Sequence, residues 1–241
     1  MYDLQKANVW KRISAAFLDV ILLFIATLGF ALLLTSVLGF DGYMAQKDAL
    51  DAQYMEEYGL DPTLTQEELD AFTDMEKESY QAAVDAANEA IRNDPELSRL
   101  LGMILSLAMV IVIFSILLSY LIFEFLVPLL FKNGQTLGKK IFGVAVMRVD
   151  GVRLTPFLLF ARTVLGKYTV GTMLPIYVVL LMLFGNMGIF GTVILGGLLV
   201  GQIICLSVTR NTCAIHDLLA GTVAVDIASQ QIFRSSQELI E

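Results

Sequence analysis

The sequence has few of the residues on which soluble enzymes and metalloproteins depend. Charged residues make up only 17% of its 241 positions, against about 25% in soluble domains. Its two cysteines, Cys205 and Cys213, are too few for a disulfide framework and do not have the spacing of metal ligands. The single histidine, His216, argues against a zinc enzyme. We therefore expect no catalytic residues, no metal site and no cofactor.

Apolar residues are abundant, at 56% of the chain, and the mean hydropathy is +0.70. Such a composition excludes both an ordinary soluble globule and a disordered chain. A membrane-spanning helix needs about 20 apolar residues, and four stretches reach this length: residues 13–40, 100–131, 169–187 and 188–208. Because these stretches are continuously apolar, they predict helices rather than the alternating strands of a barrel. We expect an all-α membrane protein, a four-span helical bundle that lies in the cell membrane in contact with the lipid bilayer.

Acidic residues are concentrated in one segment. Residues 41–99 hold sixteen acids and four bases, a net charge of −12, and the rest of the chain has a net charge of +4. Basic residues flank the first span and follow the second, which predicts that the N-terminal part of segment 1–40 and the tail 209–241 are cytoplasmic. The acidic segment is then extracytoplasmic, and the capping box Thr65-Gln66-Glu67-Glu68 favours a helical hairpin there. The rest of the sequence has no stripe of basic residues, so we expect no nucleic-acid binding.

The connection at residues 132–168 changes from continuous to alternating hydrophobicity. The turn signal Asp150-Gly151 predicts a short cytoplasmic β-hairpin, and residues 221–226 form a strand-like stretch that we expect at its edge. Thr155-Pro156 begins another helix. Because Arg162 and Lys167 are too polar for the middle of a membrane, we place residues 156–167 as an interfacial helix. One long helix kinked at Pro175 is the alternative.

Polar residues within the spans indicate a shared cluster. Asp19 and Glu124 each lie seven residues, about 10 Å, from the cytoplasmic end of their span, and Gln202 reaches a similar depth. Tyr120 is one turn from Glu124. A charge at the centre of a spanning helix costs about 2.5–3.5 kcal/mol, so it usually faces protein. The cluster either translocates a monovalent cation or a proton, or is structural and neutralised by Arg162 and Lys167.

One glycine-rich motif is similar to a phosphate-binding loop. It reads Gly134-Gln135-Thr136-Leu137-Gly138-Lys139-Lys140, is one residue short, and has Lys140 where the phosphate loop has Ser or Thr. This mismatch argues against nucleotide chemistry.

The motifs together resemble the RDD family of bacterial membrane proteins, named for one arginine and two aspartates. The resemblance rests on Lys11-Arg12 followed by Asp19, the motif at 134–140 with its hairpin at Asp150-Gly151, Ala161-Arg162, and the tail motif at 216–222. It implies that Arg12, Asp19 and Asp217 are the namesake residues. The acidic segment is longer than the family leads us to expect.

The resemblance implies a transport role, with exchange of monovalent cations for protons as the leading candidate. In this hypothesis Asp19 and Glu124 alternate between protonated and cation-bound forms while Arg162 tunes their affinity. Four spans are few for a transport path, which favours a homo-oligomer. A non-transporting accessory protein that binds a protein partner through the acidic segment is the alternative. At the membrane surface, near His216, Asp217 is expected to accept hydrogen bonds from Arg12 or Arg162 and to clamp the tail.

Overall fold

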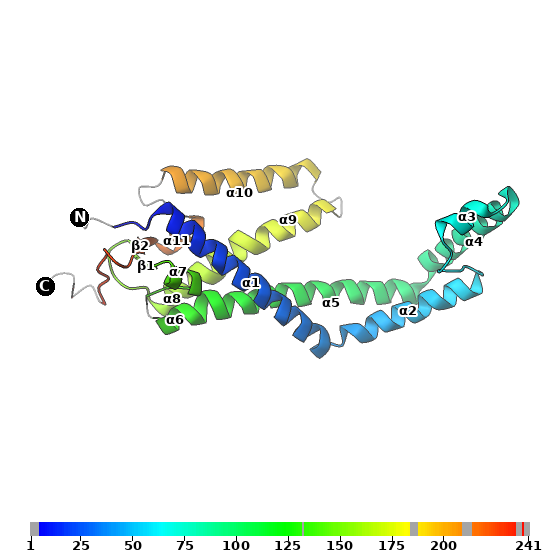
Figure 1. Ribbon diagram of the computed structural model, residues 1–241, viewed down its shortest axis with the longest axis horizontal. Helices are drawn as coiled ribbons and strands as arrows, with labels where there is room; N and C mark the ends of the chain where they lie inside the picture. Colours follow the sequence, from blue (N-terminus) through cyan, green and yellow to red (C-terminus); the bar gives the residue numbers. More distant parts are fainter. Residues whose placement is uncertain (1–4, 132, 184–187, 209–213, 235–237, 239–241) are drawn as a thin grey trace. The chain divides into compact units, whose positions relative to one another are not determined.

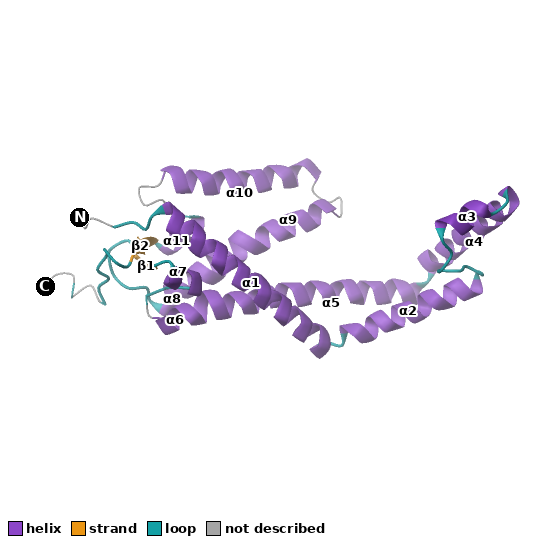
Figure 2. Cartoon of the chain, in the orientation of Figure 1, coloured by secondary structure: helices purple, strands orange, loops and turns teal. Residues whose placement is uncertain are grey.

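The structure is a computed structural model that describes residues 5–131, 133–183, 188–208, 214–234 and 238. Helices make up most of it, and its described residues contain two short strands (Figure 2). Internal contacts divide the chain into two compact units. We call residues 1–30 and 113–241 the polar unit, and residues 31–112 the acidic unit, because the latter contains all sixteen acids of the segment discussed above.

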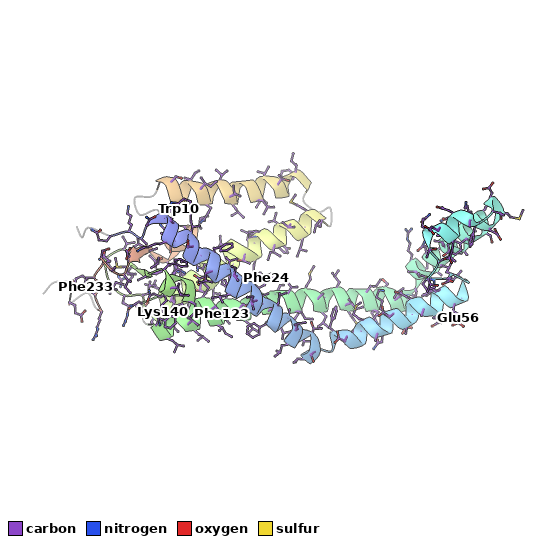
Figure 3. The ribbon with its side chains drawn as sticks, in the orientation of Figure 1. Trp10, Phe24, Glu56, Phe123, Lys140 and Phe233 are labelled. Carbon is purple, nitrogen blue, oxygen red and sulfur yellow. The ribbon has the colours of Figure 1, made fainter. Side chains whose placement is uncertain are left out.

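Within the described residues, four helices are long and apolar enough to cross a membrane, which confirms the all-α membrane class. The first is α1 (Val9–Val37). The second consists of α5 (Pro95–Ser119), the π-helix η1 (Tyr120–Leu126) and α6 (Val127–Phe131). The third consists of α8 (Pro156–Phe160), the π-helix η2 (Ala161–Met173) and α9 (Leu174–Leu183). The fourth is α10 (Gly188–Val208). The predicted end of the third span, residues 184–187, lies outside the described residues, as does Cys213. Exposed apolar side chains such as Trp10 and Phe24 on α1 (Figure 3) give these helices a surface suited to lipid.

The prediction of a separate interfacial helix at 156–167 was wrong. Elements α8, η2 and α9 follow one another without a break from Pro156 to Leu183, so the alternative of one long helix describes this region. The prediction rested on the charges of Arg162 and Lys167, which were expected to require water. Both side chains instead have carboxylate partners within the polar unit, and this pairing allows the helix to continue.

A two-stranded antiparallel sheet joins distant parts of the chain. Strand β1 (Val144–Arg148) pairs with β2 (Thr222–Asp226), and Met147 lies opposite Val223. Four side chains on one face form a buried core, namely Ala145, Met147, Val223 and Val225. The sheet contacts two short helices, α7 (Leu137–Ile141) and α11 (Ile215–Ala220) (Figure 1).

The expected hairpin is only partly present. The turn at Asp150-Gly151 forms, with Gly151 at φ 89°, but the chain after it makes isolated bridges rather than a strand. The main partner of β1 is β2, which was predicted only as an addition to the edge. The return arm is short because Thr155 already caps α8, with its hydroxyl accepting from the Leu158 N–H.

The acidic unit contains three further helices, α2 (Phe40–Glu57), α3 (Gln66–Ala71) and α4 (Asp74–Asn93). The predicted capping box of Thr65 and Glu68 is present at the start of α3, and α2 contacts α4. A second capping box, formed by Thr73 and Glu76, begins α4. This second cap separates α4 from α3, because an N-cap residue has extended backbone torsions.

Candidate functional site

A cavity of about 530 Å³ lies in the polar unit, and we call it the polar cavity. Its walls come from α1, η1, η2, α10, α11, the short helix α7 and the strands β1 and β2. All eight residues predicted as site residues line it: Arg12, Asp19, Tyr120, Glu124, Arg162, Gln202, His216 and Asp217. Two lysines, Lys139 and Lys167, also line it. The structure therefore gathers polar groups from all four of the spanning helices described above and from the sequence motifs at 134–140 and 216–222.

Asp19 is held by the glycine-rich loop. Its carboxylate accepts hydrogen bonds from the Thr136 hydroxyl at 2.5 Å and the Gly138 N–H at 2.8 Å, and Lys139 Nζ lies 3.3 Å away. Thr136 is also the N-cap of α7, so the carboxylate sits at the first turn of that helix, where negative charge is favoured. The motif that is similar to a phosphate loop thus binds an anion after all, and the anion is the side chain of Asp19.

Gly138 is required by the close approach of this loop to α1. A Cβ atom at position 138 would lie 2.3 Å from the Ala15 carbonyl oxygen and 2.8 Å from Asp19 Oδ1. No side chain fits at such distances, since the nearer atom belongs to the backbone. The glycine is therefore what allows its own N–H to reach the carboxylate.

Glu124 forms an ion pair with Lys167, and its side chain is only 3–4% exposed. The Thr163 hydroxyl donates to the Glu124 carbonyl oxygen at 2.9 Å and so ties η2 to η1. Tyr120, four residues earlier, shares a hydrogen bond of 2.9 Å with the Thr172 hydroxyl. Both Glu124 and Lys167 lie in π-helical stretches, a geometry that occurs frequently at functional sites.

Asp217 is clamped by Arg162. The guanidinium donates to Asp217 Oδ1 from Nε at 2.9 Å and from Nη2 at 2.6 Å, and both side chains are 3% exposed. The Thr222 hydroxyl donates to the same oxygen at 3.0 Å. Burial acts to raise the pKa of Asp217, but the Arg162 charge and these hydrogen bonds outweigh it and hold that pKa well below its usual range. The predicted clamp is thus present, with Arg162 as the donor.

His216 stays neutral in the folded protein. Burial, together with the nearby charge of Arg162, lowers the pKa of His216 to about 3. Its Nε2 lies 3.7 Å from Asp217 Oδ2. A Cβ at Gly166 would lie 2.6 Å from the Cβ of His216, so α11 packs closely against η2. His216 therefore contributes to the packing of α11 against η2, and its protonation would disfavour that packing.

Gln202 connects the fourth span to the tail, because its Oε1 accepts a hydrogen bond of 3.3 Å from the Ile215 N–H. The hypothesis that Asp19 and Glu124 face a common interior agrees with their burial and shared cavity. They do not compensate each other directly, since each is paired with a different lysine. The role of Lys139 escaped sequence reasoning because the lysine was considered as a cytoplasmic charge and as part of the glycine-rich motif, and not as a partner of Asp19.

No three His, Cys, Asp or Glu side chains gather into a metal-binding group anywhere in the described ranges. The polar cavity instead contains three carboxylates, each beside a cationic side chain. The fold and this cavity define a multi-pass helical membrane protein with a charged interior.

The sequence model of the RDD family matches residues 6–221, nearly the whole chain. The protein therefore belongs to the RDD family. The namesake residues Arg12, Asp19 and Asp217, as the resemblance assigned them, all line the polar cavity. No curated protein and no solved structure matched the chain.

Proposed function

We propose that the protein exchanges a monovalent cation for a proton through the polar cavity, and that Glu124 and Lys167 form the exchanging ion pair. The observation that carries this proposal is the difference among the three buried carboxylates. Asp19 and Asp217 each accept hydrogen bonds from at least three donors, whereas the Glu124 carboxylate has Lys167 as its one donor among the described residues. Glu124 is the carboxylate from which a partner is most easily displaced.

The exchange follows from charge balance. A cation that approaches Glu124 is repelled by Lys167 for as long as its amine is protonated. When the amine releases its proton, the carboxylate is left with an uncompensated charge in a buried site, which is costly. A monovalent cation restores the balance, so one proton leaves as one cation enters. Rebinding of the proton by Lys167 reverses the step and expels the cation.

The oxygen atoms near the pair suit a small hard cation. The Tyr120 and Thr172 hydroxyls line the same cavity as Glu124 and offer neutral oxygen ligands beside its carboxylate. A divalent ion would bring one charge more than Lys167 gives up. In this proposal Asp19 and Asp217 are anchors for the loop and the tail, and Glu124 alone changes partner.

We place both termini in the cytoplasm of the cell. Residues near both ends of the described chain pair with the sheet or with the segment beside it. The Asp226 N–H of β2 donates to the Gln5 carbonyl at 3.1 Å, and the N–H of Arg153, which bridges to Met147 of β1, donates to the Phe233 carbonyl at 2.9 Å. The two terminal segments therefore lie on one side of the bundle. The positive charge of the polar unit supports the cytoplasmic side.

Ion flux in proteoliposomes tests the proposal. Full-length protein is reconstituted with a pH-sensitive dye inside the vesicles, and Na⁺, K⁺ or Li⁺ is added outside. We expect cation-driven proton movement in the wild type. We expect a fall to the background of empty vesicles in the double variant Glu124→Gln/Lys167→Gln, which removes both charges of the pair and leaves no unpaired ion behind.

The matched control is Asp226→Asn. Asp226 is a carboxylate with a lysine partner, Lys11 at 2.7 Å, but it lies outside the cavity lining. We expect its flux to equal that of the wild type. Wild-type flux in the double variant, or no cation-driven proton movement in the wild type, would contradict the proposal.

A second candidate function is an accessory role for the acidic unit, which we infer from its net charge of −12 and its separate compactness. A partner with a basic surface would associate with it electrostatically. Replacing Glu67, Asp70, Asp74 and Glu78 by Gln or Asn is expected to release such a partner without changing ion flux. Identical co-purified proteins before and after the replacement would count against this candidate.

A further inference from the structure

A second cavity, also of about 530 Å³, lies within the acidic unit and plays no part in the proposed exchange. It is lined by the turn after α1, the first turns of α2 and one face of α5. We call it the Arg99 cavity, after the single charged residue in its lining. Its composition is amphiphilic: Arg99 and Tyr43 provide polar ends, and Met103, Leu107 and Val110 provide aliphatic surface.

Arg99 has no carboxylate partner in the part of the chain that the structure describes, although the acidic unit contains sixteen acids. Its side chain is exposed. A guanidinium presents a planar fork of donors that matches the oxygens of a carboxylate or a phosphate.

The sequence places Arg99 at the level of lipid headgroups. It immediately precedes an uncharged run from Leu100 to Phe123, which is long enough to cross the hydrocarbon core. A side chain at the edge of that core lies where phospholipid phosphates are found. Tyr43 has the amphipathic ring that is enriched at the same level.

The aliphatic part of the cavity continues from Arg99 along α5. Met103, Leu107 and Val110 follow at about one, two and three helical turns, on the same side of the helix. A free phosphate ion would use the guanidinium and leave this apolar surface empty. An amphiphile with an anionic head and a hydrocarbon chain matches both parts of the lining.

We propose that the Arg99 cavity binds one membrane phospholipid, with its phosphate on the Arg99 guanidinium and an acyl chain along Met103, Leu107 and Val110. The phosphate supplies the charge that the described protein residues do not. The acyl chain removes aliphatic side chains from contact with water and with disordered lipid. The site is distinct from the polar cavity and does not depend on the exchange mechanism.

Native mass spectrometry of the full-length protein tests this proposal. The protein is taken from nanodiscs that contain phosphatidylglycerol and phosphatidylcholine into mild detergent, and retained lipid is counted. We expect one retained phospholipid per chain in the wild type and about tenfold less retention in Arg99→Gln, because a charge-assisted hydrogen bond is lost. Arg92→Gln is the matched control, since Arg92 is also an exposed arginine of the acidic unit but lies outside the cavity lining.

A second variant tests the cavity without touching the charge. A Cβ at Gly102 meets no atom within 4 Å, so a side chain can start there without a clash, and in Gly102→Leu it takes up space in the cavity that Gly102 lines. We expect this variant to lose the lipid while its thermal unfolding temperature in lipid-free detergent stays at or above that of the wild type. Added phosphatidylglycerol is expected to raise the unfolding temperature of the wild type and of Arg92→Gln only.

Three results would overturn the proposal. Equal lipid retention in the wild type, Arg99→Gln and Gly102→Leu shows that the cavity holds no specific lipid. Loss in Gly102→Leu alone shows that the phosphate is not on Arg99. If millimolar inorganic phosphate displaces the lipid and reproduces the thermal shift, the ligand is a free phosphate ion rather than a phospholipid.

Discussion

The two units hold their carboxylates in opposite ways. In the polar unit each buried carboxylate is bound by residues that are distant in the chain: Thr136 and Lys139 are 117 and 120 positions from Asp19, and Arg162 is 55 positions from Asp217. In the acidic unit the carboxylates are exposed and bound by near neighbours, three positions apart in both capping boxes. The first kind of contact forms only when the helices assemble, whereas the second forms within a single helical turn.

This difference predicts how much each kind of contact contributes to the stability of the fold. A buried pair that loses one partner leaves an unpaired charge in a dry site, so its removal has a large effect. An exposed cap or a surface pair exchanges easily with water and has a small effect.

One carboxylate of the acidic unit is bound by a distant residue rather than by a near neighbour. The Tyr54 hydroxyl donates to Asp94 at 2.6 Å and joins the end of α2 to the start of α5. That hydrogen bond raises the pKa of Tyr54 to about 12.

The largest expected effect on the free energy of unfolding is at the clamp between Arg162 and Asp217. Asp217→Asn leaves the Arg162 guanidinium buried without its counter-charge, and we expect a loss of about 3–5 kcal/mol in the free energy of unfolding. The measurement is denaturant unfolding in mixed micelles. Glu68→Gln in the acidic unit serves as the control, and we expect about 1 kcal/mol or less there. Equal losses at both sites would remove the distinction between the two units.

The next largest effect is expected from glycine replacement. In Gly138→Ala the new Cβ meets the Ala15 carbonyl at 2.3 Å, so the loop must move away from Asp19. We expect destabilisation of about 3 kcal/mol, the upper range for overpacking. In the acidic unit, Gly102→Ala has open space and improves helix propensity, so we expect stabilisation of about 0.5–1 kcal/mol. Thermal unfolding that moves in the same direction in both variants would contradict this contrast.

A smaller effect should appear as the pH falls. The folded pKa of His216 is about 3, against about 6.5 in the unfolded chain, so protons bind the unfolded state preferentially. Its stability contribution is complete above about pH 6.5 and decreases as the pH falls toward 3. Between pH 6.5 and 5 we expect a loss of about 2 kcal/mol, which His216→Asn should abolish.

The carboxylates respond over a lower range of pH. The folded pKa of Asp217 is depressed, so its contribution is present above the unfolded value of about 3.9 and is lost only below it. The exposed caps Glu68 and Glu76 also have lowered pKa values, because hydrogen bonds from Thr65 and Thr73 stabilise their charged forms. A loss of stability between pH 6.5 and 5 that persists in His216→Asn would assign the effect to another group.

The smallest effect compares two threonine caps. Thr65 caps α3 and bonds only within its own turn, so Thr65→Ala should cost about 1 kcal/mol. Thr136 caps α7 and also donates to Asp19, so Thr136→Ala should cost more than Thr65→Ala. Hydrogen exchange measures both: we expect faster exchange confined to α3 in the first variant, and faster exchange in both α7 and α1 in the second. Equal and local changes would show that the Asp19 hydrogen bond contributes little.

Local signals in the sequence were sufficient for several elements. The Thr65 capping box formed as predicted, and Asp94 caps α5, with its carboxylate accepting from the Glu96 N–H at 2.7 Å. The spans were found because their length and hydropathy are properties of continuous segments. The errors concern pairing. The turn at Asp150-Gly151 was correct, but the partner of β1 lies in β2, far along the chain, and no local pattern indicates which strand will be adjacent.

By itself, the amino-acid sequence determined which segments enter the membrane, where several helices begin and which polar residues are costly enough to require partners. Hydropathy, helix capping and the free-energy cost of a charge within the membrane are properties of a single segment, so each segment of the sequence can be interpreted by itself. Only the tertiary structure decided that Lys139 and the glycine-rich loop bind Asp19, that Lys167 binds Glu124, and that Arg162 binds Asp217. These choices depend on which helix faces lie together, because an ion pair needs contact within a few ångströms and the sequence specifies only the charges.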